Sequence, residues 1–462
     1  MLTRRAALIA ILGMPCAALA LRAGAATVGE DGFITLRAME ARSPILGGDK
    51  EPLPVWAYDG QCPGPLLQVR QGERLKVRLI NQLPKPTMIH WHGVRVPNAM
   101  DGTELTQRPV APGESFDYVF APPDAGTFWY HAQYRPEVQV DRGLYGPLIV
   151  EEPEQPDVEE LVLTLDDWLI DSSGRLDDAS RGDLIAAAHE GRLGNWLTLN
   201  GSAKPRFHAS ADRRVRVRLI NAANARIMSI VLKGVDAWLG SLDGHPVAPL
   251  RLAGHPLDIA PGQRADVILP RSQEEVTLIN EMAGEPLAIA SIIRTGRTDG
   301  DTAEPPSAFG KLSPAMPTST DIFRATLRIA GGAGGGLQGA RYGGRRLTMR
   351  KLVAEGKVWA LNGEAGMTRA PLFRVDRGRE VHLVLENLSP WPQAMHIHGH
   401  FGRPIGRIGP ASPLDAFRDT VLLHPRERTT LAFVADNPGK WMLASSILEH
   451  QSTGLATWFE VV

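Results

Sequence analysis

Apolar and polar residues alternate with a period of two in three long stretches of this chain. The stretches are "LLQVRQGERLKVRLIN" (66–81), "RRVRVRLINAANARIMSIVL" (213–232) and "REVHLVLENLSPWPQAMHIHGH" (379–400). Successive side chains of a β-strand point to opposite faces, so this period is typical of half-buried strands. A similar turn and another strand follow each stretch; the turns are "PGE" at Gly113, "PGQ" at Gly262 and "PRE" at Arg426. Three copies of one strand–turn–strand plan predict an all-β chain of three similar β-sandwich domains in series.

Segments rich in Pro, Gly, Ser or acidic residues mark the predicted domain boundaries. The domains are expected over residues 27–155, 156–300 and 301–462. "EEPEQPDVEE" (151–160) separates the first two, and a Pro/Ser/Thr-rich segment (300–321) precedes the strands of the third. The Gly-rich segment 331–346 is expected to be a flexible loop inside the third domain. One helix is expected near 180–194, as a surface insertion whose His189 faces solvent.

Residues 1–26 have the features of an export signal. A short basic region with Arg4 and Arg5 precedes an apolar run, and the segment ends in an A-x-A-like "AGA". The arginine pair predicts the twin-arginine route to the periplasm, with ordinary secretion as the alternative. An apolar run of about 15 residues is short for spanning a bilayer, so no membrane span is expected in the mature chain. Removing the segment removes Cys16 and leaves Cys62 alone, so no intramolecular disulfide is expected.

The charges of the chain are nearly balanced. Its 50 Lys and Arg face 51 Asp and Glu, for a formal net charge of −1. A basic excess would indicate nucleic acid, and a basic cluster beside an apolar segment would indicate anionic lipid. The sequence shows neither, so no nucleic-acid partner is expected.

Five histidines have the spacing of metal ligands. His90 and His92 in "MIHWHG" are two residues apart in an extended run, and His396 and His398 in "MHIHGH" repeat that spacing. Residues two apart in a strand share a face, so each pair presents two imidazoles together. His131 in "FWYHAQ" ends another strand. Imidazole suits copper, zinc, iron or nickel, and the pairs occupy corresponding ends of the first and third repeats, which predicts one metal centre between them.

These motifs, together with "GLYGPLIVEE", "LDGHPVAP", "APGQRADVIL" and "WMLASSILEHQSTGL", resemble the three-domain multicopper oxidases, the laccase-like family. The resemblance covers nearly the whole mature chain. It implies three cupredoxin-like Greek-key β-sandwich domains, with metals between the first and third. Family members hold a type 1 copper that takes electrons and a trinuclear cluster that reduces dioxygen. The cluster combines a type 2 copper with a type 3 pair.

The resemblance assigns a role to each matching residue. His90 and His396 fall on the type 2 ligands, His92, His131 and His398 on three of the six type 3 ligands, His450 on a type 1 ligand, Leu455 on the axial position, and Asp101 on the acid that delivers protons. His400 follows His398 by two residues and is a possible substitute ligand. The second domain carries no ligand in this assignment, and its His245 is expected to be structural.

Several ligand positions of the family are replaced in this chain. Gln133 and Gln393 stand where histidines are expected, and Ala444, Ser445 and Ser446 replace the family's His-Cys-His. Thiolate supplies most of the electron-transfer character of a type 1 copper. We therefore expect no type 1 copper, no four-electron laccase reaction, and a His450 that remains from a former site.

Two functions follow from these residues. The first is a periplasmic oxidoreductase whose remaining type 2/type 3 site binds one or two copper ions and acts on a small molecule or a dioxygen species. Zinc in the same site is a further possibility. The alternative is a protein without metal or redox activity, which binds a protein partner in the cell envelope or division machinery. In that case the histidines are ancestral residues satisfied by hydrogen bonds.

Overall fold

A computed structural model describes residues 28–298 (apart from 49, 155 and 283–284), residue 306, and residues 321–408 and 416–462. The export signal and most of the segment before the third domain lie outside these residues. The domain limits at 155/156 and 300/301 also fall there and stay predictions. Cys62 is a free cysteine. No helix of the described part is long and apolar enough to cross a membrane.

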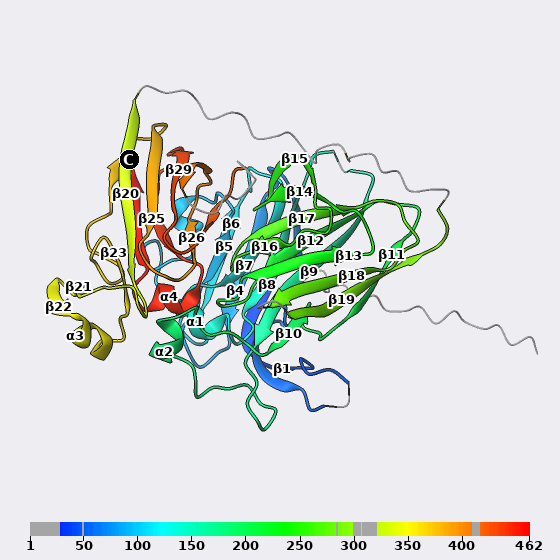
Figure 1. The fold of residues 1–462 in the computed structure, drawn as a ribbon, viewed down its shortest axis with the longest axis horizontal. Coiled ribbons are helices and arrows are strands. Elements are labelled where there is room, and N and C mark those ends of the chain that lie inside the picture. The colour runs from blue at the N-terminus through cyan, green and yellow to red at the C-terminus, as the bar shows by residue number, and fades with distance from the viewer. Residues whose placement is uncertain are drawn as a thin grey trace, which may run out of the picture.

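The first third of the chain forms two four-stranded sheets, ordered β2-β1-β4-β6 and β3-β8-β7-β5 (Figure 1). Its strands are β1 (Ile34–Ser43), β2 (Leu53–Tyr58), β3 (Leu67–Arg70), β4 (Leu75–Asn81), β5 (Ile89–His92), β6 (Ser115–Phe120), β7 (Gly126–Ala132) and β8 (Tyr145–Glu151). A 3-10 turn, η1 (Asn98–Met100), and a short helix, α1 (Pro136–Gln139), connect them. One apolar cluster that includes Leu36, Val77 and Trp91 lies between the sheets.

The middle third forms sheets ordered β10-β9-β12-β17-β14-β15 and β11-β19-β18-β13-β16. Its strands are β9 (Glu159–Trp168), β10 (Trp196–Leu199), β11 (Arg206–Ser210), β12 (Val215–Asn221), β13 (Met228–Lys233), β14 (Trp238–Leu242), β15 (His245–Arg251), β16 (Leu257–Ile259), β17 (Arg264–Leu269), β18 (Val276–Met282) and β19 (Glu285–Thr295). A short helix, α2 (Leu184–Ala187), lies between β9 and β10.

The last third forms sheets ordered β23-β20-β25-β29-β27 and β24-β31-β30-β26-β28, with a separate β21-β22 hairpin. Its strands are β20 (Ile322–Gly331), β21 (Gly339–Tyr342), β22 (Arg345–Thr348), β23 (Trp359–Leu361), β24 (Arg374–Val375), β25 (Glu380–Asn387), β26 (Gln393–Ile397), β27 (Arg403–Ile408), β28 (Thr420–Leu423), β29 (Arg428–Val434), β30 (Gly439–Ser445) and β31 (Ala456–Val461). Its helices are α3 (Met349–Ala354) and α4 (Leu448–Ser452). Every sheet of the described residues takes its strands from one third of the chain, which confirms three β-sandwich units in series.

The three units repeat one another down to single hydrogen bonds. Strands β4, β12 and β25 end in Asn81, Asn221 and Asn387. Each of these side-chain amides donates to two backbone carbonyls, and its oxygen accepts from the backbone N–H two residues later. The asparagine therefore ties the end of its strand to the following loop in every unit.

The predicted repeated turn is present in each unit. Gly113, Gly262 and Arg426 all have positive φ, at 81°, 83° and 62°. The left-handed region costs a side chain about 1–2 kcal/mol, which favours glycine at two of the three turns. The strands that follow, β6, β17 and β29, pair antiparallel with β4, β12 and β25.

Two local predictions need correction. Residues 339–346 of the predicted flexible loop belong to the β21–β22 hairpin, in which Tyr342 pairs with Arg345. Its two-residue turn, Gly343-Gly344, has φ of 57° and 79°, and a Gly-Gly pair readily adopts this type of hairpin turn. The predicted helix near 180–194 is reduced to the four residues of α2, which Asp183 caps at the N-terminus. Residues 180–182 and 188–190 form turns and residues 191–194 are irregular; Gly182, Gly191 and Gly194 disfavour a longer helix.

Candidate metal centre

Neighbouring strands of the first and third units bring the predicted histidines together. On β5 and β7, His90 and His131 are direct cross-strand partners. On β26, His396 is paired with Ala444 of β30, one of the replaced ligand positions. His398 follows β26 in a turn and donates its backbone N–H to Met442 of β30. The strands that carry the predicted histidines therefore meet at one place.

One cavity lies where these strands meet, with about 20 Å³ open to the centre of a water-sized sphere. Its lining residues are His90, His92, Trp129, His131, Gln133, Ala223, His396, His398, Ala444, Ser445, Ser446, Leu448 and Gln451. All five predicted histidines and four of the five replaced positions thus surround the same space. A single water needs a cavity of roughly 10–15 Å³, so this cavity has room for an ion or a very small molecule.

Each of the five histidines has one ring nitrogen occupied by a protein acceptor. Nδ1 lies 2.8 Å from the Asp101 carbonyl oxygen in His90, 3.0 Å from the Ala132 carbonyl in His131, 3.1 Å from the Asp419 carbonyl in His396 and 3.2 Å from the Asp101 carboxylate in His398. His92 uses Nε2 instead, 3.0 Å from the Thr420 hydroxyl oxygen. That hydroxyl donates its own proton to Asp419, so it accepts from His92.

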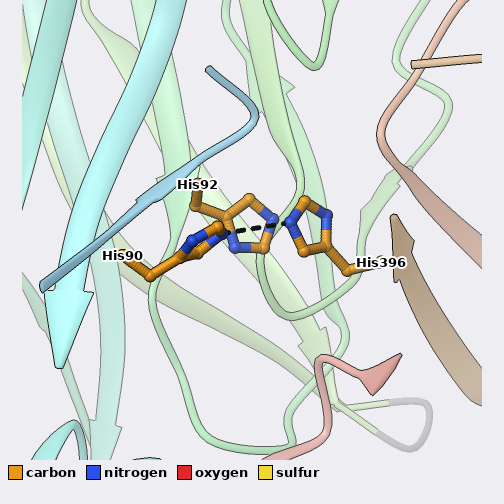
Figure 2. A group of neighbouring side chains, drawn as sticks. All are labelled: His90, His92 and His396. Atoms are coloured by element: carbon orange, nitrogen blue, oxygen red, sulfur yellow. Dashed lines mark hydrogen bonds between the residues drawn. The ribbon is translucent and has the colours of Figure 1, made fainter. Parts of the chain in front are cut away.

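These hydrogen bonds leave lone pairs on nitrogens that face each other. His90 Nε2 lies 3.3 Å from His396 Nε2 (Figure 2). His92 Nδ1 likewise lies 3.3 Å from His131 Nε2. Two neutral imidazoles with their protons elsewhere cannot bond to each other across such a contact. Two nitrogens bound to one ion at about 2.0–2.1 Å with a tetrahedral angle would be about 3.3 Å apart. The donor set therefore fits a metal ion at each pair.

The two facing pairs coincide with the assignment that the resemblance implies. His90 and His396 correspond to the type 2 ligands, and His92 and His131 to one side of the type 3 pair. Nitrogen atoms of His90, His92 and His396 also lie within 4.8 Å of one another, as do the ligand atoms of His90, Asp101 and His398. His398 also lines the cavity, with its ring centroid 3.9 Å from that of His90, and Gln133 and Ala444 stand where the resemblance places its companion ligands.

Burial keeps the cavity histidines neutral. Desolvation is the largest cause that lowers the pKa of His90, His396 and His398, and it lowers the pKa of His92 and His131 further. A metal ligand must be the neutral imidazole, so this environment prepares the nitrogens for an ion.

Asp101 is fully buried beside two of these rings. Its carbonyl oxygen accepts from His90, and its carboxylate accepts from His398. Burial by itself would raise the pKa of Asp101, but the nearby His398 and His90 lower it below the usual range. Its position beside the site agrees with the role that the resemblance implies, and the contacts show that it also orients both rings.

A second set of buried residues, absent from the predicted site, also orients the rings. Asp419 Oδ1 lies 3.2 Å from His396 Nδ1 and 3.4 Å from His92 Nε2. Arg264, from the middle unit, holds the Asp419 carboxylate through bonds of 2.9 and 2.6 Å. The signal in the sequence is an acid, Asp419, directly before the wholly buried strand β28. The middle unit thus supports the site although it supplies no ligand.

Asp243 completes this set. It lies in the "DG" turn between β14 and β15 and accepts hydrogen bonds from the backbone N–H groups of Arg264 and Thr420. Burial, followed by the charge of Asp419, raises the pKa of Asp243 to about 7. The turn therefore joins the middle unit to the strand that carries Thr420.

The former type 1 region is closed by hydrogen bonds within the protein. The side-chain amide of Gln393 lies 2.9 Å from Nδ1 of His450, and the His189 carbonyl oxygen lies 2.9 Å from Nε2. The Gln393 atom at this distance is Oε1, so both ring nitrogens of His450 face an oxygen, and a neutral imidazole donates its one N–H to one of the two. Burial lowers the pKa of His450 to about 3. The Ser445 hydroxyl accepts from the backbone N–H of Ile447.

Two other histidines differ from their predictions. His400 does not line the cavity; its ring packs among Phe433, Trp441 and Phe459, which excludes it as a substitute ligand there. His189 is half-buried, packs against Trp391 and caps His450 with its carbonyl, so it is more than a solvent histidine. His245 is buried and packs against Phe401, in keeping with a structural role.

Comparison with known proteins agrees with this geometry. Family models described as multicopper oxidase match residues 42–155, 159–277 and 343–462. The multicopper oxidase MmcO of Mycobacterium tuberculosis is 30% identical over 440 residues, which cover 88% of this chain and 82% of that protein.

Solved structures of multicopper oxidases are also similar to this chain. A multicopper oxidase from Pseudomonas thermotolerans shares 32% identity at a TM-score of 0.80, covering 93% of this chain and 99% of the other. Lac15 from a marine microbial metagenome shares 33% identity at a TM-score of 0.71, covering 92% and 99%. The chain therefore belongs to the multicopper oxidase family of copper-binding oxidoreductases.

Proposed function

We propose that this protein is a copper-dependent oxidoreductase that keeps only a reduced form of the family's type 2/type 3 centre and has no type 1 copper. The observation that carries the proposal is the pair of facing, unprotonated nitrogens of His90 and His396, 3.3 Å apart. Nitrogens in this arrangement gain a common partner only when a cation lies between them. The similar pair of His92 and His131 supports room for a second ion.

The chain's own residues would hold and orient this centre. Asp101 and Asp419 keep the imidazole protons on the far side of the rings, which fixes the nitrogen that each ring offers. Bound copper would supply one-electron chemistry toward a small molecule or a dioxygen species. The chain lacks the family's electron entry, since Ser445 and Gln393 replace a thiolate and an imidazole, so oxidation of phenols by the family route is not part of the proposal.

We further propose that the protein acts in the periplasm after twin-arginine export. The paired Arg4 and Arg5, the apolar run and the small-residue end of the first 26 residues support this proposal. Export in a folded state would allow copper to be inserted before or after translocation.

The test is the metal content of the mature protein purified from a copper-supplemented periplasm. We expect about one or two copper ions per chain in the wild type, in line with two facing nitrogen pairs, and their loss in the variant His90→Ala/His396→Ala. Variant His382→Ala/His424→Ala is the matched control, because these histidines lie outside the cavity lining, and it should keep its copper.

Other outcomes separate the alternatives. Zinc in place of copper would leave a structural or hydrolytic site. A wild type without any metal would refute the proposal and favour the interaction protein of the cell envelope.

A further inference from the structure

The walls of the cavity are not uniformly buried. Of its thirteen lining residues, eleven are buried, including every histidine. The remaining two, Gln133 and Gln451, are partly exposed. Solvent therefore approaches the cavity, within the described part of the chain, on the side where these two amides lie.

The region around His450, Gln393 and Ser445 is buried. His450, Gln393 and Ser445 are 0%, 0% and 1% exposed, and the His189 carbonyl covers the outer edge of the His450 ring. Helices α1 and α2 both lie against α4 in this region (Figure 1). A molecule cannot reach the site through the former type 1 region without breaking these contacts.

The two glutamine side chains are weakly held. The Gln133 amide donates to the Met442 sulfur over 3.5 Å, and thioether sulfur is a weak acceptor. The Gln451 side chain makes no hydrogen bond to the described residues, although its backbone N–H donates to Ile447 within α4. Exposed side chains without firm partners change rotamer quickly, so both amides can move aside.

We propose that Gln133 and Gln451 form the mouth of the metal site and select ligands of two or three heavy atoms that bind a metal through oxygen or nitrogen. Hydrogen peroxide and small inorganic anions belong to this class. About 20 Å³ of space, part of which the ion itself would take, leaves room only for small ligands and excludes an aromatic ring. The resemblance implies a metal-ligating histidine at position 133. In this chain Gln133 forms part of the entrance instead. The inference rests on the proposed copper centre and adds its substrate class.

Azide is a suitable probe, because its binding to copper(II) changes the absorption spectrum. The copper-loaded mature protein is mixed rapidly with azide, and the association rate is compared in Gln133→Trp and Gln451→Trp. We expect each substitution to slow association by about tenfold or more, since entry then waits for a conformational change. Copper per chain is measured in each variant, and the rates are compared at equal copper occupancy. Gln68→Trp, at an exposed position of β3, is the matched control and should leave the rate as it is.

Smaller side chains test the same mouth from the other direction. The variant Gln133→Ala/Gln451→Ala should bind azide faster and should admit imidazole, which is too large for the wild-type entrance. Unchanged rates in both tryptophan variants, or an alanine variant with wild-type rates and no response to imidazole, would overturn the inference. If the wild type binds no copper, the proposed function itself fails, which is a distinct result.

Discussion

At the scale of single residues, the chemistry of this protein depends on which nitrogen of each histidine carries its proton. His90 and His92 are two residues apart in one strand, yet they offer different atoms. The Asp101 carbonyl oxygen accepts a hydrogen bond from Nδ1–H of His90, whereas the Thr420 hydroxyl oxygen accepts one from Nε2–H of His92. The acceptors around the rings therefore decide which lone pairs meet in the cavity.

The former type 1 region should be recoverable by two substitutions. Gln393 contacts Nδ1 of His450, and the resemblance implies that Ser445 stands at the position of the family's cysteine. Variant Gln393→His/Ser445→Cys restores two imidazoles and a thiolate, the trigonal set of a blue copper site. We expect an intense blue absorption after copper loading, measured in the visible spectrum. Neither the wild type nor Gln393→His alone should show it. A colourless double variant with copper bound only at the histidine cavity would contradict the assignment of these positions.

His450 should make the protein sensitive to acid. The pKa of His450 is lowered from 6.5 to about 3, so the ring stays neutral in the folded protein but takes up a proton when the chain unfolds below pH 6.5. Stability should fall as the pH drops from about 6.5 toward 3, by about 1.4 kcal/mol per pH unit for this one group. Denaturant unfolding of the metal-free protein between pH 4 and 7 (about the range where the effect is largest) measures the slope. His450→Gln should be less stable at neutral pH but should have a slope smaller by one proton. Parallel profiles would contradict this.

At the scale of an element, the turn before β17 has a second function that its counterpart before β6 lacks. A Cβ at Gly262 would lie 2.7 Å from His92 Cε1 and 3.0 Å from its Nε2, whereas a Cβ at Gly113 would have no atom within 4 Å. Both glycines have φ near +80°. In the first unit, Gly113 is therefore favoured only because the backbone of the turn has positive φ. In the second unit, Gly262 is also needed because a side chain there would collide with His92.

Alanine substitutions at the two turns distinguish the effect of positive φ from the effect of the contact with His92. Gly113→Ala and Gly262→Ala should each lose about 1–2 kcal/mol, because both place a side chain in the left-handed region. Only Gly262→Ala should also displace His92 and lower the copper content per chain. Thermal unfolding and metal analysis of the two variants provide the comparison. Equal copper in both would show that the ring of His92 can move without loss of the site.

At the scale of the whole molecule, a fully buried ion pair joins the middle and last units. Arg264 of β17 binds Asp419, which precedes β28, and neither side chain is exposed. Asp419 in turn contacts His396 and His92, which belong to the third and first units. All three units therefore meet at one carboxylate beside the cavity.

Removing the arginine should destabilise the assembly of the units strongly. Arg264→Met leaves the Asp419 carboxylate buried without its cation, a change that typically costs about 3–5 kcal/mol. Arg328→Met breaks an exposed pair with Glu386 and should cost less than about 1 kcal/mol. Unfolding curves of both variants, followed with copper content, check the difference. A loss for Arg264→Met as small as that for Arg328→Met would contradict the role given to this pair.

The sequence by itself determined the all-β fold, the three repeats and the set of cavity histidines. These features are local: a period of two, a turn of three residues and a His-x-His spacing can each be read within one strand or loop. The resemblance also implies that Gln133, Gln393 and Ala444–Ser446 replace ligand positions, because they stand inside motifs that otherwise match the family.

Only the tertiary structure decided which ring nitrogens face the cavity and how the site is closed. Arg264 and Asp419 are 155 residues apart, and the His189 carbonyl reaches His450 across 261 residues. Contacts of this kind cannot be predicted from a local sequence pattern. The residues next to each partner form that partner's own strand or turn and say nothing about the distant residue that it contacts. The same is true of the mouth at Gln133 and Gln451, which exists because β7 and α4 come from units that pack against each other around a shared cavity.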